Sequence, residues 1–413
     1  MTTRLASATI SDRNLSRTRP RLLAAIASTA VAAALATVTF NAVRVNTHAT
    51  LSDALLLGAG VLLLVAVVIE PSVHPRPPLW FTVGGLTLVA SGIISLAVSG
   101  ATADSLALVA EFGVAALLAP LIIGTASRSA RWLVLFTDLW LISAGLNGLT
   151  ALLDFLGVTA IGRGLLSREF LHRMSGLTIH PNHLGIVVAM ALPVAIAQMA
   201  SPGSRRRRLF YGLLAAAMAI GLLLSGSRAA FAGALAGLVL LFIIAGRDRR
   251  RITLYVGGLI SIGLVAVTLA LATHTNFITL ERFAGVDTGQ TVGTRLALYR
   301  EALSDFASSP IVGHGFQLIV RAHDIYLQLL QAGGLLALGV FTAYIVGTLR
   351  LAWRLGHNPV VPAAMGPLVA GLSASILVFL VNGVAENQLV DRYLYVPIGL
   401  LLGLSLLSSE FSE

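Results

Sequence analysis

Long apolar runs and short polar connections alternate along nearly the whole chain. A helix needs about 20 mostly apolar residues to cross the hydrocarbon core of a membrane. Runs of this kind predict twelve membrane-spanning helices, at 21–40, 51–69, 79–99, 105–125, 132–153, 183–200, 209–224, 229–245, 252–272, 325–348, 361–382 and 394–410. We therefore expect an all-α polytopic membrane protein in which residues 1–413 form a single integral membrane domain.

The longest polar stretch lies between the ninth and tenth predicted spans, at residues 273–324. Loops longer than about 12–15 residues are usually functional or disordered. Charged residues such as Arg295 and Arg300 alternate there with leucines such as Leu296 at helical spacing, which predicts an amphipathic helix over 294–308 at the outer membrane surface. We expect this stretch to be an extracytoplasmic catalytic loop.

The composition agrees with a membrane protein and narrows its chemistry. Of the 413 residues, 56% are hydrophobic and only 11% are charged, whereas about a quarter of a soluble protein is charged. This excludes a soluble enzyme. The chain has no cysteine, which excludes disulfides, thiolate nucleophiles and iron–sulfur clusters. All 28 basic residues are arginine, so every basic group is a permanently charged planar fork.

The arginines divide unequally between the two sides of the predicted membrane domain. If the N-terminus is cytoplasmic, eighteen of the 28 lie on the cytoplasmic side, including the blocks Arg205–Arg208 and Arg249–Arg251. Short cytoplasmic loops carry an excess of basic residues, so we predict that both termini lie in the cytoplasm. We interpret the blocks as anchors against anionic headgroups, not as nucleic-acid sites.

The other ten arginines are predicted to lie on the outer side, against the cytoplasmic excess of basic residues. Their positions are therefore candidates for a functional role. Eight of them gather near a few helix ends, at Arg163, Arg168, Arg173, Arg228, Arg282, Arg295, Arg300 and Arg321. Guanidinium groups bind phosphate oxygens bidentately. Clustered permanent cations at one membrane surface predict an anionic substrate, and a lipid-linked diphosphate fits both the charge and the membrane.

Polar side chains around these arginines are candidate site residues. His323 lies at the outer end of the tenth predicted span, where a neutral imidazole can take a proton from a sugar hydroxyl. The alternative is that His323 only caps the helix or binds a loop carbonyl. The candidates for substrate binding are Arg173, His180, Asn182, Arg300, Arg321, Asp324 and Tyr326.

Other chemistries have weaker support. His180 and His183, together with His172, are an alternative zinc set, but the chain has no recognisable metal signature. It also has no Asp-x-Asp motif, Walker loop or dinucleotide fingerprint, which argues against ATP and nucleotide-sugar donors. Glu111 and Asp138 lie within apolar runs, where acids are either functional or paired near a helix end.

Five outward-facing motifs follow one another in an order that resembles a known family. They are RMSGLTIHPNHLG at 173–185, SGSRAAFAGALAG at 225–237, GTRLALYREAL at 293–303, SSPIVGHGF at 308–316 and AHDIYLQLLQAGGLLAL at 322–338. Together they resemble the O-antigen ligase and polymerase superfamily of bacterial membrane glycosyltransferases. The similarity covers about residues 170–345.

The resemblance implies a GT-C-like fold with an outward catalytic cavity, and a reaction that uses no metal, ATP or other cofactor. The donor is a glycan on polyprenyl diphosphate, and an acceptor hydroxyl attacks with inversion at the anomeric carbon. Arg228 and Arg295 match the family arginines that hold the diphosphate, and His323 matches the catalytic histidine. The family commonly has His-Asn where this chain has His323-Asp324.

We therefore expect an O-antigen ligase-like enzyme at the outer face of a bacterial cytoplasmic membrane. Its expected partners are the lipid-linked donor, a glycan or lipid acceptor and the bilayer, with no nucleic acid. One alternative is a polymerase of the same superfamily. Another is a twelve-helix proton-coupled transporter, which predicts internal repeats, although the 273–324 loop has no counterpart after the third span. A scaffold or flippase partner is the third alternative.

Overall fold

The computed structural model describes residues 22–45, 49–69, 77–100, 102–162, 173–272, 288–316 and 322–410. Within these ranges the regular structure is helical, and the only β-type pairing is one isolated bridge between Arg44 and Thr50. Eight helices of the described part are long and apolar enough to cross a membrane. The all-α, multi-pass character that the sequence predicts is thus confirmed.

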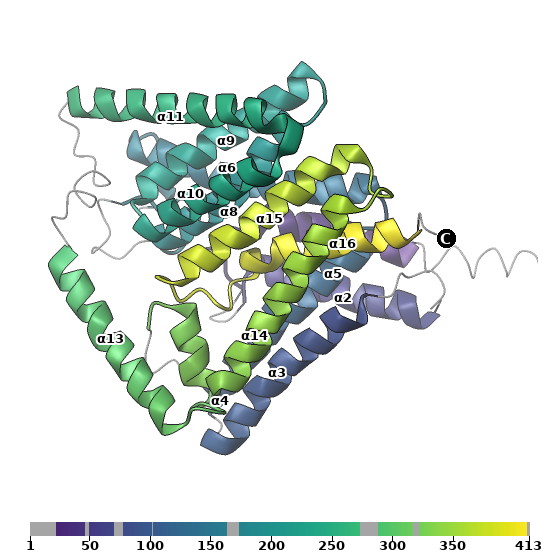
Figure 1. Ribbon diagram of the computed structural model, residues 1–413, viewed down its shortest axis with the longest axis vertical. Helices are drawn as coiled ribbons and strands as arrows, with labels where there is room; N and C mark the ends of the chain where they lie inside the picture. Colours follow the sequence, from purple (N-terminus) through teal and green to yellow (C-terminus); the bar gives the residue numbers. More distant parts are fainter. Residues whose placement is uncertain are drawn as a thin grey trace, which may run out of the picture.

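The predicted apolar runs all fall on helices (Figure 1). Before the long polar stretch, a helix at Leu22–Thr37 precedes α2 (Leu51–Ile69), α3 (Leu79–Ser99), α4 (Ala103–Gly113), α5 (Ala119–Ala126), α6 (Ala130–Phe155), α8 (Pro181–Ala200), α9 (Arg205–Ser225), α10 (Arg228–Ile244) and α11 (Arg249–Ala272). After it come α13 (Thr288–Ser308), α14 (Ile325–His357), α15 (Gly366–Gly383) and α16 (Val396–Glu410). A π-helical turn at Val114–Leu118 joins α4 to α5. Eight of the described helices are long and apolar enough to cross a membrane, so the count of twelve membrane-spanning helices stays a prediction.

The span predicted at 325–348 falls on α14, which is long and apolar enough to cross a membrane but is broken at Gly334. Within α14, Gly334 has φ 62° and ψ −158°, a conformation that is essentially restricted to glycine. A Cβ at Gly334 would lie 2.5 Å from the carbonyl group of Ile311. The helix therefore consists of a short segment that begins at Ile325 and a long segment that ends at His357, and the two meet at an angle (Figure 1).

The loop that follows α13 holds this break in place. The backbone N–H of Leu335 donates to the carbonyl of Pro310 at 2.9 Å, and the N–H of His314 donates to Gln331 O at 2.9 Å. The Ser95 hydroxyl donates to the carbonyl of Ala332. These bonds satisfy backbone groups that the broken helix leaves open. The SSPIVGHGF motif thus has a structural role at the turn of α14.

Small residues bring neighbouring helices into close contact. On α10, a Cβ at Gly233 would lie 2.9 Å from Val378 O, and a Cβ at Gly237 would lie 3.1 Å from Ala374 O. Both carbonyls belong to α15. Small residues at this spacing allow two helix backbones to approach closely inside a membrane. The α10–α15 pair is therefore closely packed behind the Arg228 end of α10.

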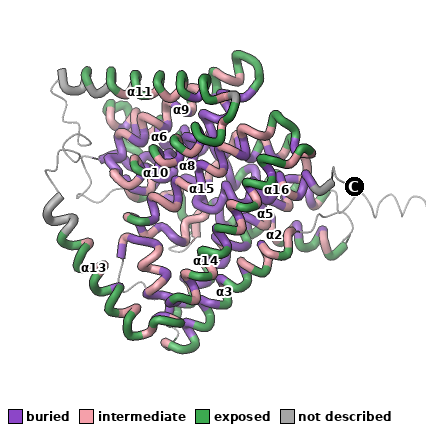
Figure 2. Tube along the Cα trace, viewed as in Figure 1, coloured by how far each residue is buried: buried purple, intermediate pink, exposed green. Residues whose placement is uncertain are grey.

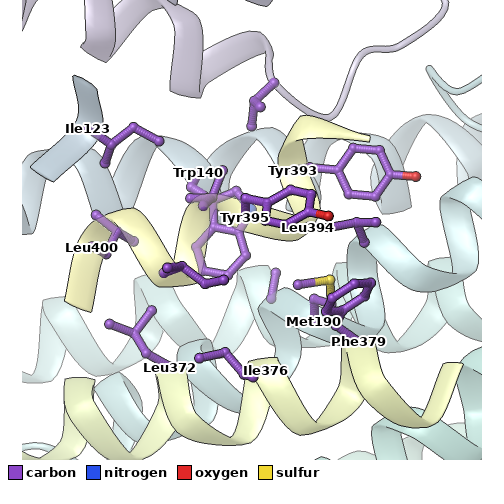
Figure 3. Close-up of a cluster of buried hydrophobic side chains, with 14 of the residues drawn as sticks. Ile123, Trp140, Met190, Leu372, Ile376, Phe379, Tyr393, Leu394, Tyr395 and Leu400 are labelled. Carbon is purple, nitrogen blue, oxygen red and sulfur yellow. The ribbon is translucent and has the colours of Figure 1, made fainter. Parts of the chain in front are cut away.

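Large side chains from α6, α8, α15 and α16 and from the segment before α16 fill the centre of the bundle (Figure 3). Trp140 is 1% exposed, and the rings of Phe379 and Tyr395 lie 6.0 Å apart. The buried Tyr395 hydroxyl donates to Leu389 O at 2.7 Å. A buried phenol needs such a partner, so this bond orients the chain between α15 and α16.

The helix predicted over 294–308 is confirmed as α13, which is longer than expected. It runs along the periphery of the bundle and is largely exposed (Figure 2). Leu296 is 47% and Leu303 is 49% exposed. An outward apolar stripe is the feature expected of a helix at a membrane surface. That location of α13 stays a prediction.

Candidate active site

The N-terminus of α8 is organised by His180. This residue is the N-cap, and its Nδ1 accepts a hydrogen bond from the backbone N–H of Asn182 at 3.0 Å. Pro181 follows at the first helical position, where proline is favoured because no N–H is needed. His180 therefore caps the helix whose first turn carries Asn182 and His183.

A buried polar chain joins Arg173, Asn182 and Glu386. The Arg173 guanidinium donates to Ser225 O at 2.8 Å and to the Asn182 side-chain oxygen. The Asn182 amide then donates to Glu386 Oε1 at 2.6 Å. Arg173 and Glu386 are 6% and 4% exposed. Because buried charges need compensation, this chain ties the start of α8 to the end of α9 and to the loop after α15.

Arg228 and Arg295 meet at the same place. Arg228 begins α10, directly after Ser227, whose hydroxyl accepts from Ala230 N at 3.4 Å. Both arginines line one pocket with Asn182, Ser227, Ala229 and Glu386. The pocket volume is about 20 Å³, which is room for roughly one water molecule. Arg295 Nη2 lies 3.8 Å from Glu386 Oε1, so a carboxylate already lies beside this guanidinium.

One face of α13 carries Arg295 to this pocket. The Tyr299 hydroxyl, one turn further on, donates to Val384 O at 3.4 Å. Asp305 Oδ2 accepts a hydrogen bond from the Gln331 amide at 2.6 Å. Residues spaced three or four apart lie on one side of a helix. The polar face of α13 therefore packs on the bundle, while Leu296 and its neighbours on the opposite face are exposed.

His323 and Asp324 begin the short segment of α14. His323 has φ 48° and is the only non-glycine residue with positive φ among the described residues. Asp324 is the N-cap, and its Oδ1 accepts from Tyr326 N at 2.8 Å and Leu327 N at 2.9 Å. The Tyr326 hydroxyl donates to Leu380 O at 2.7 Å. These contacts attach the segment to the end of α15, close to the loop that carries Glu386.

The Tyr299 phenol lies near both the arginine pocket and the Asp324 cap of α14. Burial raises the pKa of Tyr299, and the negative charges of Asp324 and Glu386 raise it further. The positive charge of Arg295 lowers this pKa and so opposes the shift. Tyr299 therefore lies within electrostatic range of the α14 cap and of the arginine pocket. Burial also raises the pKa of Asp324, although its two backbone hydrogen bonds oppose the shift.

Comparison with known protein families finds a match in the central part of the chain. Residues 213–342 match the family model described as O-antigen ligase. This region is an O-antigen ligase family domain. It spans most of α9, all of α10, α11 and α13, and the break in α14. No curated protein matches the chain.

The O-antigen ligase domain contains Arg228, Arg295 and His323, whereas Arg173, Asn182 and Glu386 lie outside residues 213–342. The structure brings Arg228, Arg295 and Asn182 together, and connects Arg173 to them through Asn182. His323 is not among the residues that line their pocket. The arginine pocket and its polar neighbours are thus assembled from the family domain and from chain segments before and after it.

The remaining predicted residues have other roles or other places. His180 and Asp324 cap helices, and Tyr326 binds the end of α15. Arg300 lies on α13 and is exposed. Arg321 lies outside the described residues. Among the described residues predicted to bind substrate, Asn182 alone lines the arginine pocket, and it lies outside the O-antigen ligase domain.

Two site residues were missed by the sequence reasoning, Glu386 and Tyr299. Glu386 lies in the predicted outward loop between the last two spans, and an acid among outward arginines was an available signal. Tyr299 follows Arg295 at the i,i+4 spacing that places both on one helix face. That spacing was a second available signal.

The histidines proposed as zinc ligands take part in a different network. His183 Nδ1 lies 2.7 Å from Asn41 Nδ2, 3.2 Å from the Tyr393 hydroxyl and 3.4 Å from Asp391 Oδ2. No group of three His, Cys, Asp or Glu side chains in the described part of the chain is placed to hold a metal ion. His172 lies outside the described residues.

The sequence left two interpretations of Asp138 open, a functional acid inside the membrane or an acid paired near a helix end. The contacts of Asp138 favour the second interpretation. Its Oδ1 accepts from the Tyr211 hydroxyl at 2.7 Å. Arg207, in the basic block that begins α9, lies within hydrogen-bonding distance of Tyr211 at 3.3 Å and donates to Gln198 at 2.9 Å. Asp138 is therefore part of a structural network that leads to the arginine block.

Proposed function

We propose that this protein is a glycosyltransferase of the O-antigen ligase type. It moves a glycan from polyprenyl diphosphate to an acceptor hydroxyl at the outer face of a bacterial cytoplasmic membrane. The observation that carries the proposal is the shared pocket of Arg228 and Arg295, two arginines of the family domain that come from different helices. Two permanent guanidinium forks facing one cavity match the oxygens of a diphosphate.

The charges around the pocket fit a leaving group of this kind. Glu386 lies against Arg295 and Asn182 in the resting protein and neutralises part of the positive charge. A diphosphate carries more negative charge than one carboxylate, so it competes with Glu386 for Arg295. The pocket of about 20 Å³ is too small for a diphosphate, and donor binding therefore requires Glu386 or α13 to move.

In the proposed reaction His323 acts as the general base. The acceptor hydroxyl oxygen forms a bond to the anomeric carbon while its proton passes to the imidazole. The bond from that carbon to the diphosphate oxygen breaks, and its electron pair leaves with the polyprenyl diphosphate. Arg228 and Arg295 stabilise the charge that develops on the leaving group, as preorganised donors do in other transfer reactions. The strained backbone of His323 (φ 48°) is of a type that concentrates at functional sites.

The orientation of the protein follows from the arginine bias. The pocket lies at the N-termini of α8 and α10 and at the end of α15, whereas Arg205–Arg208 begin α9 near the opposite end of α8. If the basic blocks are cytoplasmic, the pocket faces outward and both termini are cytoplasmic. The outer face is the side on which the lipid-linked glycan donors of this enzyme family are expected.

The direct test is transfer by the purified protein supplied with a lipid-linked glycan and an acceptor. We expect transfer by the natural protein and by Arg206→Ala, which removes an exposed arginine at the opposite end of the bundle. We expect no transfer by His323→Ala or Arg295→Ala. Full activity in both of these variants would refute the assignment of the site.

Ligases and polymerases of this superfamily release the same lipid diphosphate and differ in the acceptor. We favour a ligase because the chain is compact and has one modest outer loop. Gel analysis of glycans from a deletion strain separates the two activities. Long chains that accumulate on the lipid carrier indicate a ligase, and loss of long chains with single repeats left indicates a polymerase.

A further inference from the structure

A second concave surface lies between α3 and the long segment of α14, away from the arginine pocket. It is a groove of about 570 Å³ whose lining includes two glycines, Gly84 and Gly347. A Cβ at Gly347 would lie 2.7 Å from the Trp80 ring, and a Cβ at Gly84 would lie 3.6 Å from the Tyr344 ring. The glycines therefore allow the Trp80 and Tyr344 rings to lie directly against the opposite helix. The groove is also lined by Trp80, Val83, Thr87, Val340, Arg350 and Arg354.

Contacts at the end of α14 show on which side of the bundle the groove opens. Trp353 lines another pocket together with Ala200, the last residue of α8, and Asp248, which directly precedes α11. Arg251 of α11 also donates to Ala200 O at 3.1 Å. The C-terminal part of α14 thus lies at the end of the bundle that carries the arginine blocks, opposite the Arg228–Arg295 pocket.

The groove carries its charged side chains at one end and is mainly apolar along the rest of its length. Arg350 and Arg354, one helical turn apart, are the only charged side chains among the described residues that line it. Both are exposed, and neither has an ion-pair partner in the described part of the chain. Val340 lies ten residues before Arg350, or about 15 Å along a helix. This is about the thickness of one leaflet of the hydrocarbon core.

We propose that the α3–α14 groove binds one anionic phospholipid of the cytoplasmic leaflet. The two guanidinium groups hold the headgroup phosphate, as basic pockets between membrane helices do. One acyl chain lies against Val83 and Val340, and the Trp80 ring lies at the level where tryptophan is favoured in membranes. A zwitterionic lipid fills the same apolar space but brings its own cation to the two arginines, so the charge pattern selects an anionic headgroup.

Native mass spectrometry of the full chain in detergent tests this proposal. Phosphatidylglycerol and phosphatidylcholine with identical acyl chains are the probes. We expect one phosphatidylglycerol to be retained in preference to phosphatidylcholine. The double variant Arg350→Gln/Arg354→Gln should bind phosphatidylglycerol about tenfold more weakly or worse. Thr87→Trp, which fills the apolar part and keeps both arginines, should also lose the lipid.

The matched control is Arg205→Gln/Arg206→Gln, which removes two exposed arginines at the same end of the bundle but outside the groove. This variant should retain the lipid. Undiminished binding in the Arg350/Arg354 variant would overturn the proposal. Equal losses in the two double variants would also overturn it, because they would show diffuse attraction to the basic surface. None of these readouts depends on glycan transfer.

Discussion

Arg295 of α13 lies with its Nη2 3.8 Å from Oε1 of Glu386, which in turn accepts a hydrogen bond from Asn182. A single carboxylate thus connects the peripheral helix α13 to the start of α8. Arg228 lines the same small pocket. This relationship makes Glu386 a competitor with the anion that the arginines are proposed to bind. The site lies where four separate parts of the chain meet, namely α8, α10, α13 and the loop after α15.

Removal of either pocket arginine should slow transfer strongly. Loss of one preorganised donor to a developing negative charge costs about 10²- to 10³-fold in kcat, and we expect this for Arg228→Ala and Arg295→Ala. Arg295→Lys should be intermediate, because it keeps the charge and loses the bidentate fork. Transfer rates at saturating donor give the comparison, with Arg206→Ala, an exposed arginine outside the pocket, as the control. A near-normal rate for Arg228→Ala would remove this residue from the site.

Glu386→Gln should strengthen binding of the released polyprenyl diphosphate. The amide keeps an oxygen that accepts from Asn182 but no longer neutralises Arg295. Because Arg295 is partly exposed, the gain is modest, about two- to fivefold in the inhibition constant of the product. Inhibition of transfer by added lipid diphosphate measures it. Weaker product inhibition in the variant would show that Glu386 organises the pocket instead of competing for it.

A test of the role of His323 requires a substitution that tolerates the backbone conformation at this position. Its φ of 48° strains most residues but suits glycine, and asparagine tolerates it. His323→Gly, His323→Asn and His323→Ala should all lose about 10²- to 10⁴-fold in transfer, while the first two should keep the thermal stability of the natural protein. If His323→Asn retains transfer, the imidazole is not the base, and the histidine serves only the helix start.

Asp324 should make stability depend on pH. Burial raises its pKa above the usual 3.8, so the folded protein still holds a proton that the unfolded chain has released. Stability therefore falls as pH rises from about 3.8 through the raised pKa, and the loss persists above it. Asp324→Asn caps the helix without this cost, so its advantage in Tm should grow across this range and then level off. Asp324→Ala should lose about 1 kcal/mol from the missing cap. A constant difference between Asp and Asn at all pH values would contradict the shift.

Gly334→Ala should destabilise the protein and reduce transfer. An alanine at φ 62°, ψ −158° costs on the order of 1–3 kcal/mol, and its Cβ would meet the Ile311 carbonyl at 2.5 Å. The control is Gly339→Ala on the same helix, where no atom lies within 4 Å of the added Cβ. Thermal unfolding in detergent and transfer rates are the measurements. Equal behaviour of the two variants would mean that α14 is not broken at Gly334.

Much of the helical framework was predictable. The predicted runs 51–69 and 79–99 coincide with α2 and α3, and 252–272 ends with α11. Membrane thickness sets the length of an apolar run, so hydrophobicity alone locates such helices. The helical spacing of charged and leucine residues likewise predicted α13, because one turn of helix determines which residues share a face.

The break in α14 was not predictable in the same way. The segment around Gly334 is apolar on both sides, and an apolar run with two glycines is compatible with a continuous span. Gly334 adopts its conformation because the loop after α13 packs against it and supplies carbonyl partners for Leu335 and Leu336. This is a contact between distant parts of the chain, and hydrophobicity carries no information about it.

The sequence by itself determined that the protein is helical and has apolar segments long enough to cross a membrane. Those properties depend on the local content of apolar and charged residues. Only the tertiary structure decided that Arg228 and Arg295 share a pocket, that Glu386 lies between Arg295 and Asn182, and that His180 and Asp324 are helix caps. Charge pairing depends on distance through space, and distances between separate helices are set by how those helices pack.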